Sequence, residues 1–180
     1  MALVSTIDVA VRCDSWIRVF PAAERLAQEA ARLALADGMA ASDWVAKAPV
    51  ELGITLADAA EQRRLNRDFR GQDVPTNVIA FPVWEPGTRI PVDAPVLLGD
   101  VVLALETVAH EAAEQEKSLG DHLRHLVVHG VLHLLGFDHL TTADATVMES
   151  LEKSILAKLG VADPYRDTAC SLKCGRTRDE

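Results

Sequence analysis

The sequence predicts an α/β (α+β) fold in which a small mixed β-sheet of about four strands is flanked by helices. Two observations predict it. Short apolar runs alternate with Ala-, Leu- and Glu-rich segments over roughly the first 105 residues, and a series of helical segments follows them. The length of 180 residues suits one domain, and a hydrophobic content of 49% is enough for one sizeable core.

The first elements follow from periodicity and from glycine and proline. Residues 3–11 alternate apolar and polar side chains with one break, which predicts a first strand. The segment 21–37 is rich in Ala, Leu, Glu and Arg at helical spacing. Pro21 suits the first turn of a helix and Gly38 suits its end, so this segment is predicted to be the first helix.

Three further apolar runs predict the remaining strands, at 50–56, 78–81 and 97–105. Pro82 lacks a backbone donor, so it places the strand 78–81 at or near an edge of the sheet. The proline-rich stretch 84–95 is predicted to be a loop. Helices are predicted at 57–69, 106–117, 121–135 and 142–159.

Composition and charge exclude several classes of protein. The formal charge is −9, so a general basic field for nucleic acid is absent and a polyanion would need a local basic patch. The chain has no apolar run of the roughly 18 residues that a membrane span requires, and it begins without a signal-peptide pattern. Three cysteines do not make a disulfide framework. We therefore expect a cytoplasmic protein without a membrane partner, with a catalytic domain at 1–160 and a flexible tail at 161–180.

Histidines carry the strongest chemical signal. On a helix, His122, His125, His129 and His133 share a face about 80° wide. The other positions of this helix are almost all apolar, which predicts that the helix is buried. Buried imidazoles require partners, and a metal ion satisfies several of them at once.

The spacing also predicts which histidines bind the ion. His129 and His133 lie one helical turn apart and can point at one centre, whereas His125 and His133 are about 12 Å apart along the axis and cannot. Gly136 permits a chain reversal after the helix, which would bring His139 back. We expect one Zn²⁺ per chain, on this central helix and the turn after it, bound by His129, His133 and His139 with a fourth position open for chemistry.

This ligand spacing is that of metzincin proteases, with one difference. Gly130 stands where those enzymes carry a glutamate base, which argues against peptide hydrolysis and not against metal binding. Asp138 is a candidate catalytic residue, as a base or by orienting a ligand, and a turn-capping role is equally open. His122 and His125 are expected to be exposed or hydrogen-bonded helix residues, and residues 110–114 a solvated helix face.

A local basic cluster is the second candidate site. Residues 63–70 hold four arginines and one aspartate, and Arg63, Arg64 and Arg67 are the candidate substrate-binding residues. Arginine binds phosphate through paired donors and keeps its charge. From the residues alone, a solvated face with local salt bridges is the favoured alternative.

Four segments resemble the YbeY family of bacterial zinc-dependent endoribonucleases of ribosomal RNA maturation. They are Leu65–Arg70, Pro75–Pro82, Leu98–Val102 and His125–His139. The resemblance implies a small mixed sheet with a cleft, zinc ligands at His129, His133 and His139, and a functional arginine at Arg70. Ala80 stands where the family often has Ser, and Phe137 where it often has Tyr.

The resemblance also implies an activity and partners. It implies a hydrolase of phosphodiester bonds, a single-strand-specific, metal-dependent endoribonuclease that acts in processing the 3' end of 16S rRNA and in ribosome quality control. The implied partners are ribosomal RNA, the small ribosomal subunit and its maturation factors. Two alternatives remain: a metal-dependent hydrolase of another bond, such as a peptidase, and a non-catalytic ribosome-assembly factor that contains zinc.

Overall fold

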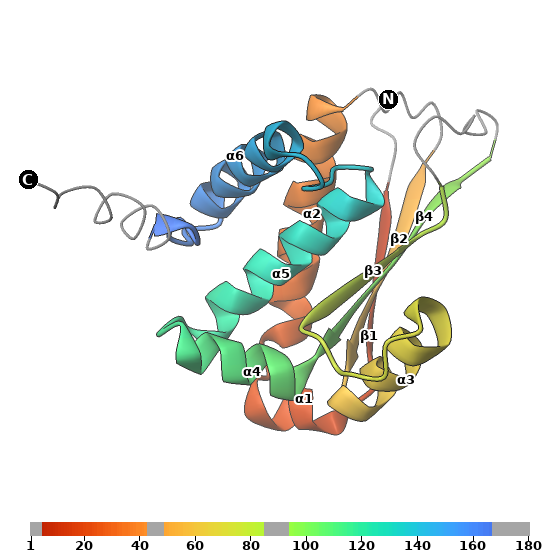
Figure 1. Cartoon of the computed structure of the whole chain (residues 1–180), viewed down its shortest axis with the longest axis vertical. Coiled ribbons are helices and arrows are strands. Elements are labelled where there is room, and N and C mark those ends of the chain that lie inside the picture. The colour runs from red at the N-terminus through yellow and green to blue at the C-terminus, as the bar shows by residue number, and fades with distance from the viewer. Residues whose placement is uncertain (1–4, 43–48, 85–93, 167–180) are drawn as a thin grey trace, which may run out of the picture.

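The computed structural model describes residues 5–42, 49–84 and 94–166, which form a four-stranded sheet and six helices (Figure 1). In chain order the elements are β1 (Thr6–Val11), α1 (Asp14–Val19), α2 (Ala23–Ala41), β2 (Val50–Ala57), α3 (Ala59–Arg70), β3 (Val78–Pro82), β4 (Val96–Ala104), α4 (Leu105–Glu114), α5 (Leu119–Leu134) and α6 (Thr142–Lys158). The predicted fold class is confirmed.

The sheet is mixed, with the strand order β1-β2-β4-β3. Strands β1, β2 and β4 are parallel to one another, and β3 runs antiparallel to β4. β3 therefore forms one edge of the sheet, as Pro82 predicts for the run before it. This arrangement places β3 next to α5, so the edge strand and the histidine-bearing helix face each other.

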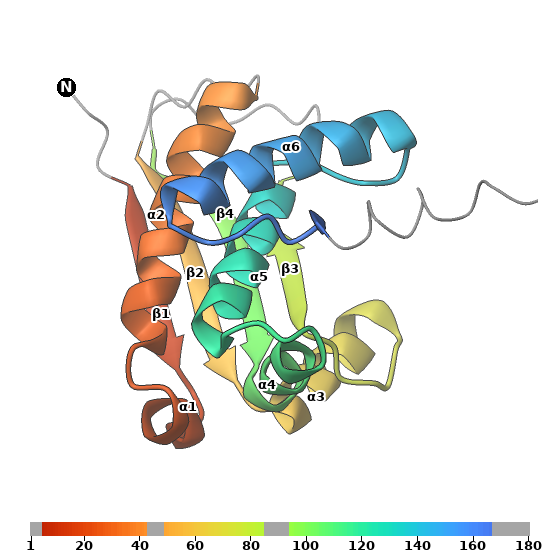
Figure 2. The same cartoon turned by 90° about the vertical axis from the view of Figure 1, so that its left-hand side faces the viewer.

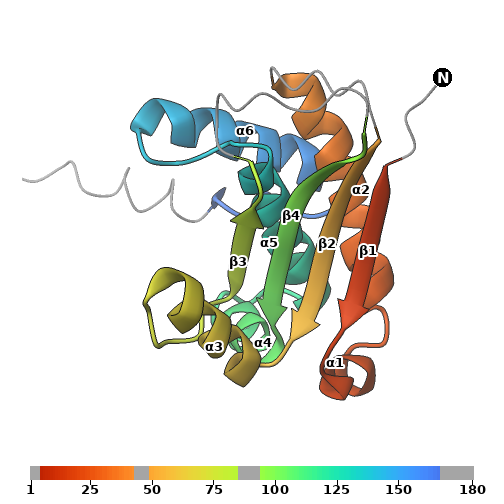
Figure 3. The same cartoon turned by 90° about the vertical axis from the view of Figure 1, so that its right-hand side faces the viewer.

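Helices cover the two faces of the sheet unequally. α2 and α5 pack side by side on one face, and α6 crosses over them as an outer layer (Figure 2). α3 lies on the opposite side, beside β3 and β4, and much of that face carries no helix of the described residues (Figure 3). α5 contacts α2, α4, α6, β3 and β4, which makes it the central helix of the molecule. Its burial confirms the prediction from its apolar sequence.

Two features of the fold differ from the sequence expectation or lie beyond it. The short helix α1 is not predicted, because six residues are too few to show a helical period. It is held by Trp16, which is fully buried and whose indole Nε1 donates to the Ala57 carbonyl at 2.8 Å. The loop prediction for 84–95 and the cysteines Cys170 and Cys174 lie largely or wholly outside the described residues.

The proposed domain boundary at residue 160 stays a prediction. The segment 161–166, just beyond that boundary, contacts the domain: Val161 is buried in the core and Tyr165 hydrogen-bonds to Glu152 of α6. In the part of the chain that the structure describes, we find no helix with the length and apolarity needed to cross a bilayer.

Candidate metal centre

A glycine turn after α5 returns the chain toward the helix. Gly136 has a φ of +88°, a conformation that a residue without a Cβ adopts without strain. The backbone N–H of Phe137 donates to the carbonyl of Leu132 at 3.1 Å, which closes the turn on the last helical residues. The chain reversal expected from Gly136 is thus present, and it brings His139 beside the end of α5.

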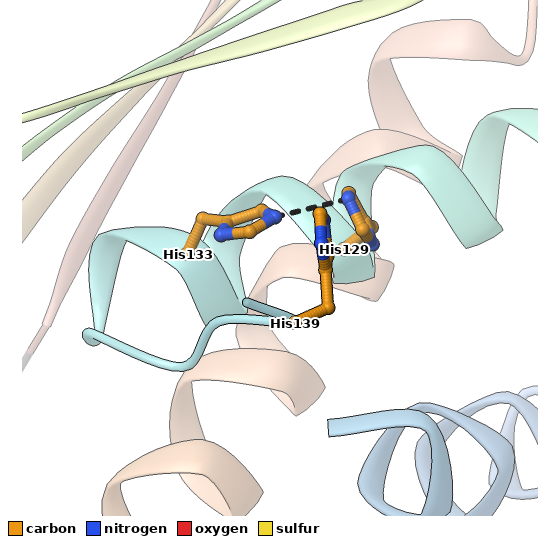
Figure 4. A group of neighbouring side chains, drawn as sticks. All are labelled: His129, His133 and His139. Carbon is orange, nitrogen blue, oxygen red and sulfur yellow. Dashed lines mark hydrogen bonds between the residues drawn. The ribbon is translucent and has the colours of Figure 1, made fainter. Parts of the chain in front are cut away.

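The three predicted ligand residues converge at this point. Each of the three residues offers one ring nitrogen, and these three nitrogens, from His129, His133 and His139, all lie within 4.8 Å of one another (Figure 4). The Nε2 atoms of His129 and His133 are 3.1 Å apart. Two nitrogens bound at about 2.0–2.1 Å to one tetrahedral ion lie about 3.3–3.4 Å apart, so this pair fits a single ion closely.

A buried carboxylate fixes the orientation of the first of these rings. The side chain of Glu152, on α6, has no exposed surface, and its Oε1 lies 2.7 Å from Nδ1 of His129. An ionised carboxylate only accepts hydrogen bonds, so Nδ1 is the donor and Nε2 keeps a lone pair. Although burial alone raises the pKa of Glu152, hydrogen bonds from His125, His129 and Tyr165 lower it to about 2.

His133 is also suited to bind a cation. Burial lowers the pKa of His133 to about 4, and the neighbouring His129 and His139 contribute to the same shift. The ring is therefore neutral at physiological pH, and a neutral imidazole is the form that binds a metal. His139 is exposed and closes the group from the solvent side.

These side chains line a pocket of about 400 Å³. Its lining residues are Arg70, Asn77, Val78, Ala80, Pro82, Trp84, His129, Gly130, His133, Gly136, Phe137, Asp138 and His139. Arg70 reaches it from the end of α3 and donates from Nη2 to the Ala80 carbonyl at 3.2 Å. Asp138 accepts a hydrogen bond from the backbone N–H of His139 at 2.7 Å, so it caps the turn while it lines the pocket.

The other arginines of the basic cluster lie elsewhere on α3. Arg63 makes two 2.8 Å hydrogen bonds to the carboxylate of Asp73, and Arg67 lies 3.2 Å from Asp68. Arg64 also pairs with Asp68, at 3.6 Å. None of these three arginines is among the residues that line the pocket, and all are more than half exposed. The structure thus brings Arg70 to the histidines and leaves the other three on a solvated face.

A second hydrogen-bond network supports the pocket wall at Asn77. The Asn77 amide donates to Glu111 of α4 at 2.9 Å, and the same carboxylate oxygen lies 2.9 Å from Nε2 of His122. Burial lowers the pKa of His122, against the opposing effect of Glu111. His122 is therefore a hydrogen-bonded helix residue, as expected. The expectation of a solvated face at 110–114 is therefore wrong for Glu111, whose side chain faces the interior. Neither Asn77 nor Glu111 could be found from the sequence, because their contact joins residues 34 positions apart.

Gly130 is required by the packing of α5 on the sheet. A Cβ atom at this position would lie 2.6 Å from Cγ1 and 3.1 Å from Cγ2 of Val101, and 3.4 Å from Cγ2 of Val78. The contact below 3.0 Å would force Val101 of β4 to move, whereas Val78 of β3 would lie at an ordinary contact distance. The glycine therefore lets the histidine-bearing helix approach β3 and β4.

Comparisons with known proteins agree on one family. A model of the family "Endoribonuclease YbeY" matches residues 20–160. A protein of that name from Paramagnetospirillum magneticum is 49% identical over 164 residues, which cover 89% of this chain and 96% of the relative. One from Nitrobacter winogradskyi is 45% identical over 159 residues, covering 88% of this chain and 80% of the relative.

A solved structure shares the fold. The solution structure of a Thermotoga maritima protein is similar with a TM-score of 0.50 at 20% identity, covering 88% of this chain and 98% of the other. At this identity the similarity concerns the fold alone.

Proposed function

Since the chain belongs to the YbeY family of endoribonucleases, we propose that it is a zinc-dependent endoribonuclease that cleaves single-stranded RNA. The observation that carries this proposal is the convergence of three imidazoles and Arg70 on one pocket. We further propose that it acts in the cytoplasm on ribosomal RNA, at the 3' end of 16S rRNA and in ribosome quality control. Its partners would be the small ribosomal subunit and its maturation factors.

The chemistry of the side chains around the pocket indicates a separate role for each of them. His129, His133 and His139 would hold the ion, which when bound polarises a phosphoryl oxygen and activates water. Arg70 presents guanidinium donors toward the same pocket, where they would bind a phosphate oxygen and stabilise the charge that develops on it. Asp138 offers a carboxylate at the pocket wall and is our candidate for accepting a proton.

Peptide hydrolysis is the less favoured activity for this site. The metalloprotease mechanism needs a carboxylate base next to the first histidine, and Gly130 has no side chain. The pocket instead places Arg70 near the histidines, which suits a phosphodiester substrate.

The purified protein loaded with zinc is expected to cleave single-stranded RNA and to leave a peptide panel uncut. His129→Ala should abolish the RNA cleavage, because it removes one ligand from the ion. The measurement is the appearance of RNA fragments on a gel, with duplex RNA of the same sequence and wild type treated with a chelator as controls. Cleavage that persists in His129→Ala would identify a contaminating nuclease. Wild type that binds zinc and cuts no RNA would favour the non-catalytic assembly factor.

Reversing the charge of Arg63 and Arg64 together is expected to weaken RNA binding and to flatten its dependence on salt. Each arginine that no longer neutralises a phosphate should reduce the slope of log affinity against log salt by about 0.7 for single strands. Fluorescence anisotropy with labelled RNA at several salt concentrations measures both quantities. The matched control reverses the charge of Arg25 and Arg32 of α2. Both side chains are exposed, and the double substitution changes the net charge by the same amount. Equal effects of the two double variants would mean that the basic cluster has no special part in binding.

A further inference from the structure

Glu152 connects three segments of the chain around one buried carboxylate. Its Oε1 lies 2.7 Å from Nδ1 of His129, and its Oε2 lies 3.5 Å from Nε2 of His125. The hydroxyl of Tyr165, beyond the end of α6, also hydrogen-bonds to Oε2. Both imidazoles belong to α5, so the carboxylate links α5, α6 and the segment after α6.

We propose that Glu152 is a positioning residue of the metal centre, held by Tyr165, that orients the His129 ring and strengthens its binding of a divalent cation of the zinc class. This inference rests on the proposed function, because it needs His129 to be a metal ligand. It adds to that function two residues, Glu152 and Tyr165, that do not line the pocket.

The balance of charge around Glu152 supports this role. Its side chain has no exposed surface, and burying an ionised carboxylate is unfavourable unless the charge is compensated. Among the ion pairs of the described residues, those of Glu152 are with His125 and His129, and neither is with a lysine or an arginine. A divalent cation on the far side of the His129 ring would add to the favourable interaction of this carboxylate through the imidazole.

The hydrogen bond also fixes the tautomer that a metal requires. With Nδ1–H of His129 donated to Glu152, the lone pair is on Nε2, the atom that lies 3.1 Å from Nε2 of His133. A carboxylate in this position raises the basicity of the ligand and prevents rotation of the ring. Glu152 therefore selects the ring atom that faces the other histidines.

Tyr165 is held in place by contacts of its own segment. Its backbone N–H donates to the side chain of Asp163 at 2.9 Å, and the ammonium of Lys153 lies 5.1 Å from the centre of its ring. Val161 anchors the start of the segment in the core. The phenol is thus fixed against α6, where it restrains the carboxylate that in turn restrains His129.

The test compares zinc affinity in Glu152→Gln and Tyr165→Phe with wild type, by competition against a chelating dye. Glu152→Gln keeps the size of the side chain and removes its charge, and we expect zinc to bind about 10- to 100-fold more weakly. Tyr165→Phe leaves the carboxylate in place and should weaken binding less, though measurably. The matched control is Glu114→Gln, which changes an exposed carboxylate 3.4 Å from His110 on α4 and should leave zinc affinity unchanged.

A second measurement separates positioning from simple support of the fold. Nitrogen NMR of the zinc-free protein reports which nitrogen of His129 carries the proton, and we expect the Nδ1–H form to lose population in Glu152→Gln. Folded Glu152→Gln that binds zinc as tightly as wild type would overturn the inference and leave the proposed function intact. If Glu152→Gln does not fold, an unchanged zinc affinity in Tyr165→Phe overturns it instead. Wild type that binds no zinc would contradict the proposed function itself.

Discussion

His139→Ala is expected to lower zinc affinity by a factor on the order of 10³ and to abolish RNA cleavage. The apparent free energy of zinc binding at structural sites is about 10–16 kcal/mol, and one of three protein ligands carries a large share of such an energy. The two remaining imidazoles, on adjacent turns of α5, leave half of a tetrahedral ion without protein ligands. Metal analysis of the purified variant and a dye-competition titration measure the decrease.

The same substitution should leave the fold nearly unchanged. His139 is exposed and lies after the turn, so its removal opens no cavity in the core. Urea unfolding of the zinc-free proteins should therefore give similar free energies for wild type and variant. His110→Ala, at an exposed histidine of α4, is the matched control and should keep both zinc and activity. An unchanged zinc affinity in His139→Ala would remove this residue from the ligand set.

Arg70→Ala is expected to reduce kcat for RNA cleavage by about 10²- to 10³-fold, the usual effect of removing one donor that stabilises developing charge. Zinc content should stay at the wild-type level, because Arg70 is not a candidate ligand. Initial rates at saturating RNA, with metal analysis of the same sample, separate the two effects. The matched control is Arg25→Ala on α2, since Arg25 is exposed, pairs with Glu29 and does not line the pocket.

Arg70→Lys distinguishes charge from geometry. Lysine restores the positive charge without the paired planar donors, so we expect it to recover only part of the rate that Arg70→Ala removes. Arg70 also donates to the Ala80 carbonyl at the edge strand, and unfolding curves of both variants check that the domain stays folded without this exposed hydrogen bond. A rate unchanged in Arg70→Ala would show that the pocket acts on RNA without this arginine.

The sequence predicts the parts of the site that depend on local geometry. The spacing of four residues on one helix predicts that His129 and His133 point at one centre. Gly136, which follows that helix, predicts that the chain brings His139 back toward them. The edge position of β3 follows from the missing donor of Pro82. Each of these predictions depends only on residues that are close to the feature along the chain.

The rest of the site depends on contacts between distant segments. Glu152 lies 23 residues after His129 along the chain, and nothing in their spacing indicates a contact. The sequence does carry one signal. Glu152 lies at helical spacing from the apolar residues Met148 and Ile155, on the buried face of α6, and a charged residue on a buried face requires a partner. The sequence also leaves open whether the arginines of the basic cluster bind substrate or form salt bridges, because the pairing of Arg63 with Asp73 depends on the turn after α3.

The absence of a side chain at position 130 restricts how this scaffold can change its chemistry. A single substitution is not enough to convert the site into a peptidase, because the Cβ of a glutamate placed there would clash with Val101 of β4. Acquiring that base would require a smaller residue at position 101 of β4, or a helix displaced from the sheet together with two of its histidines. Evolving or engineering a protease from this fold would therefore first require a different packing contact between α5 and the sheet.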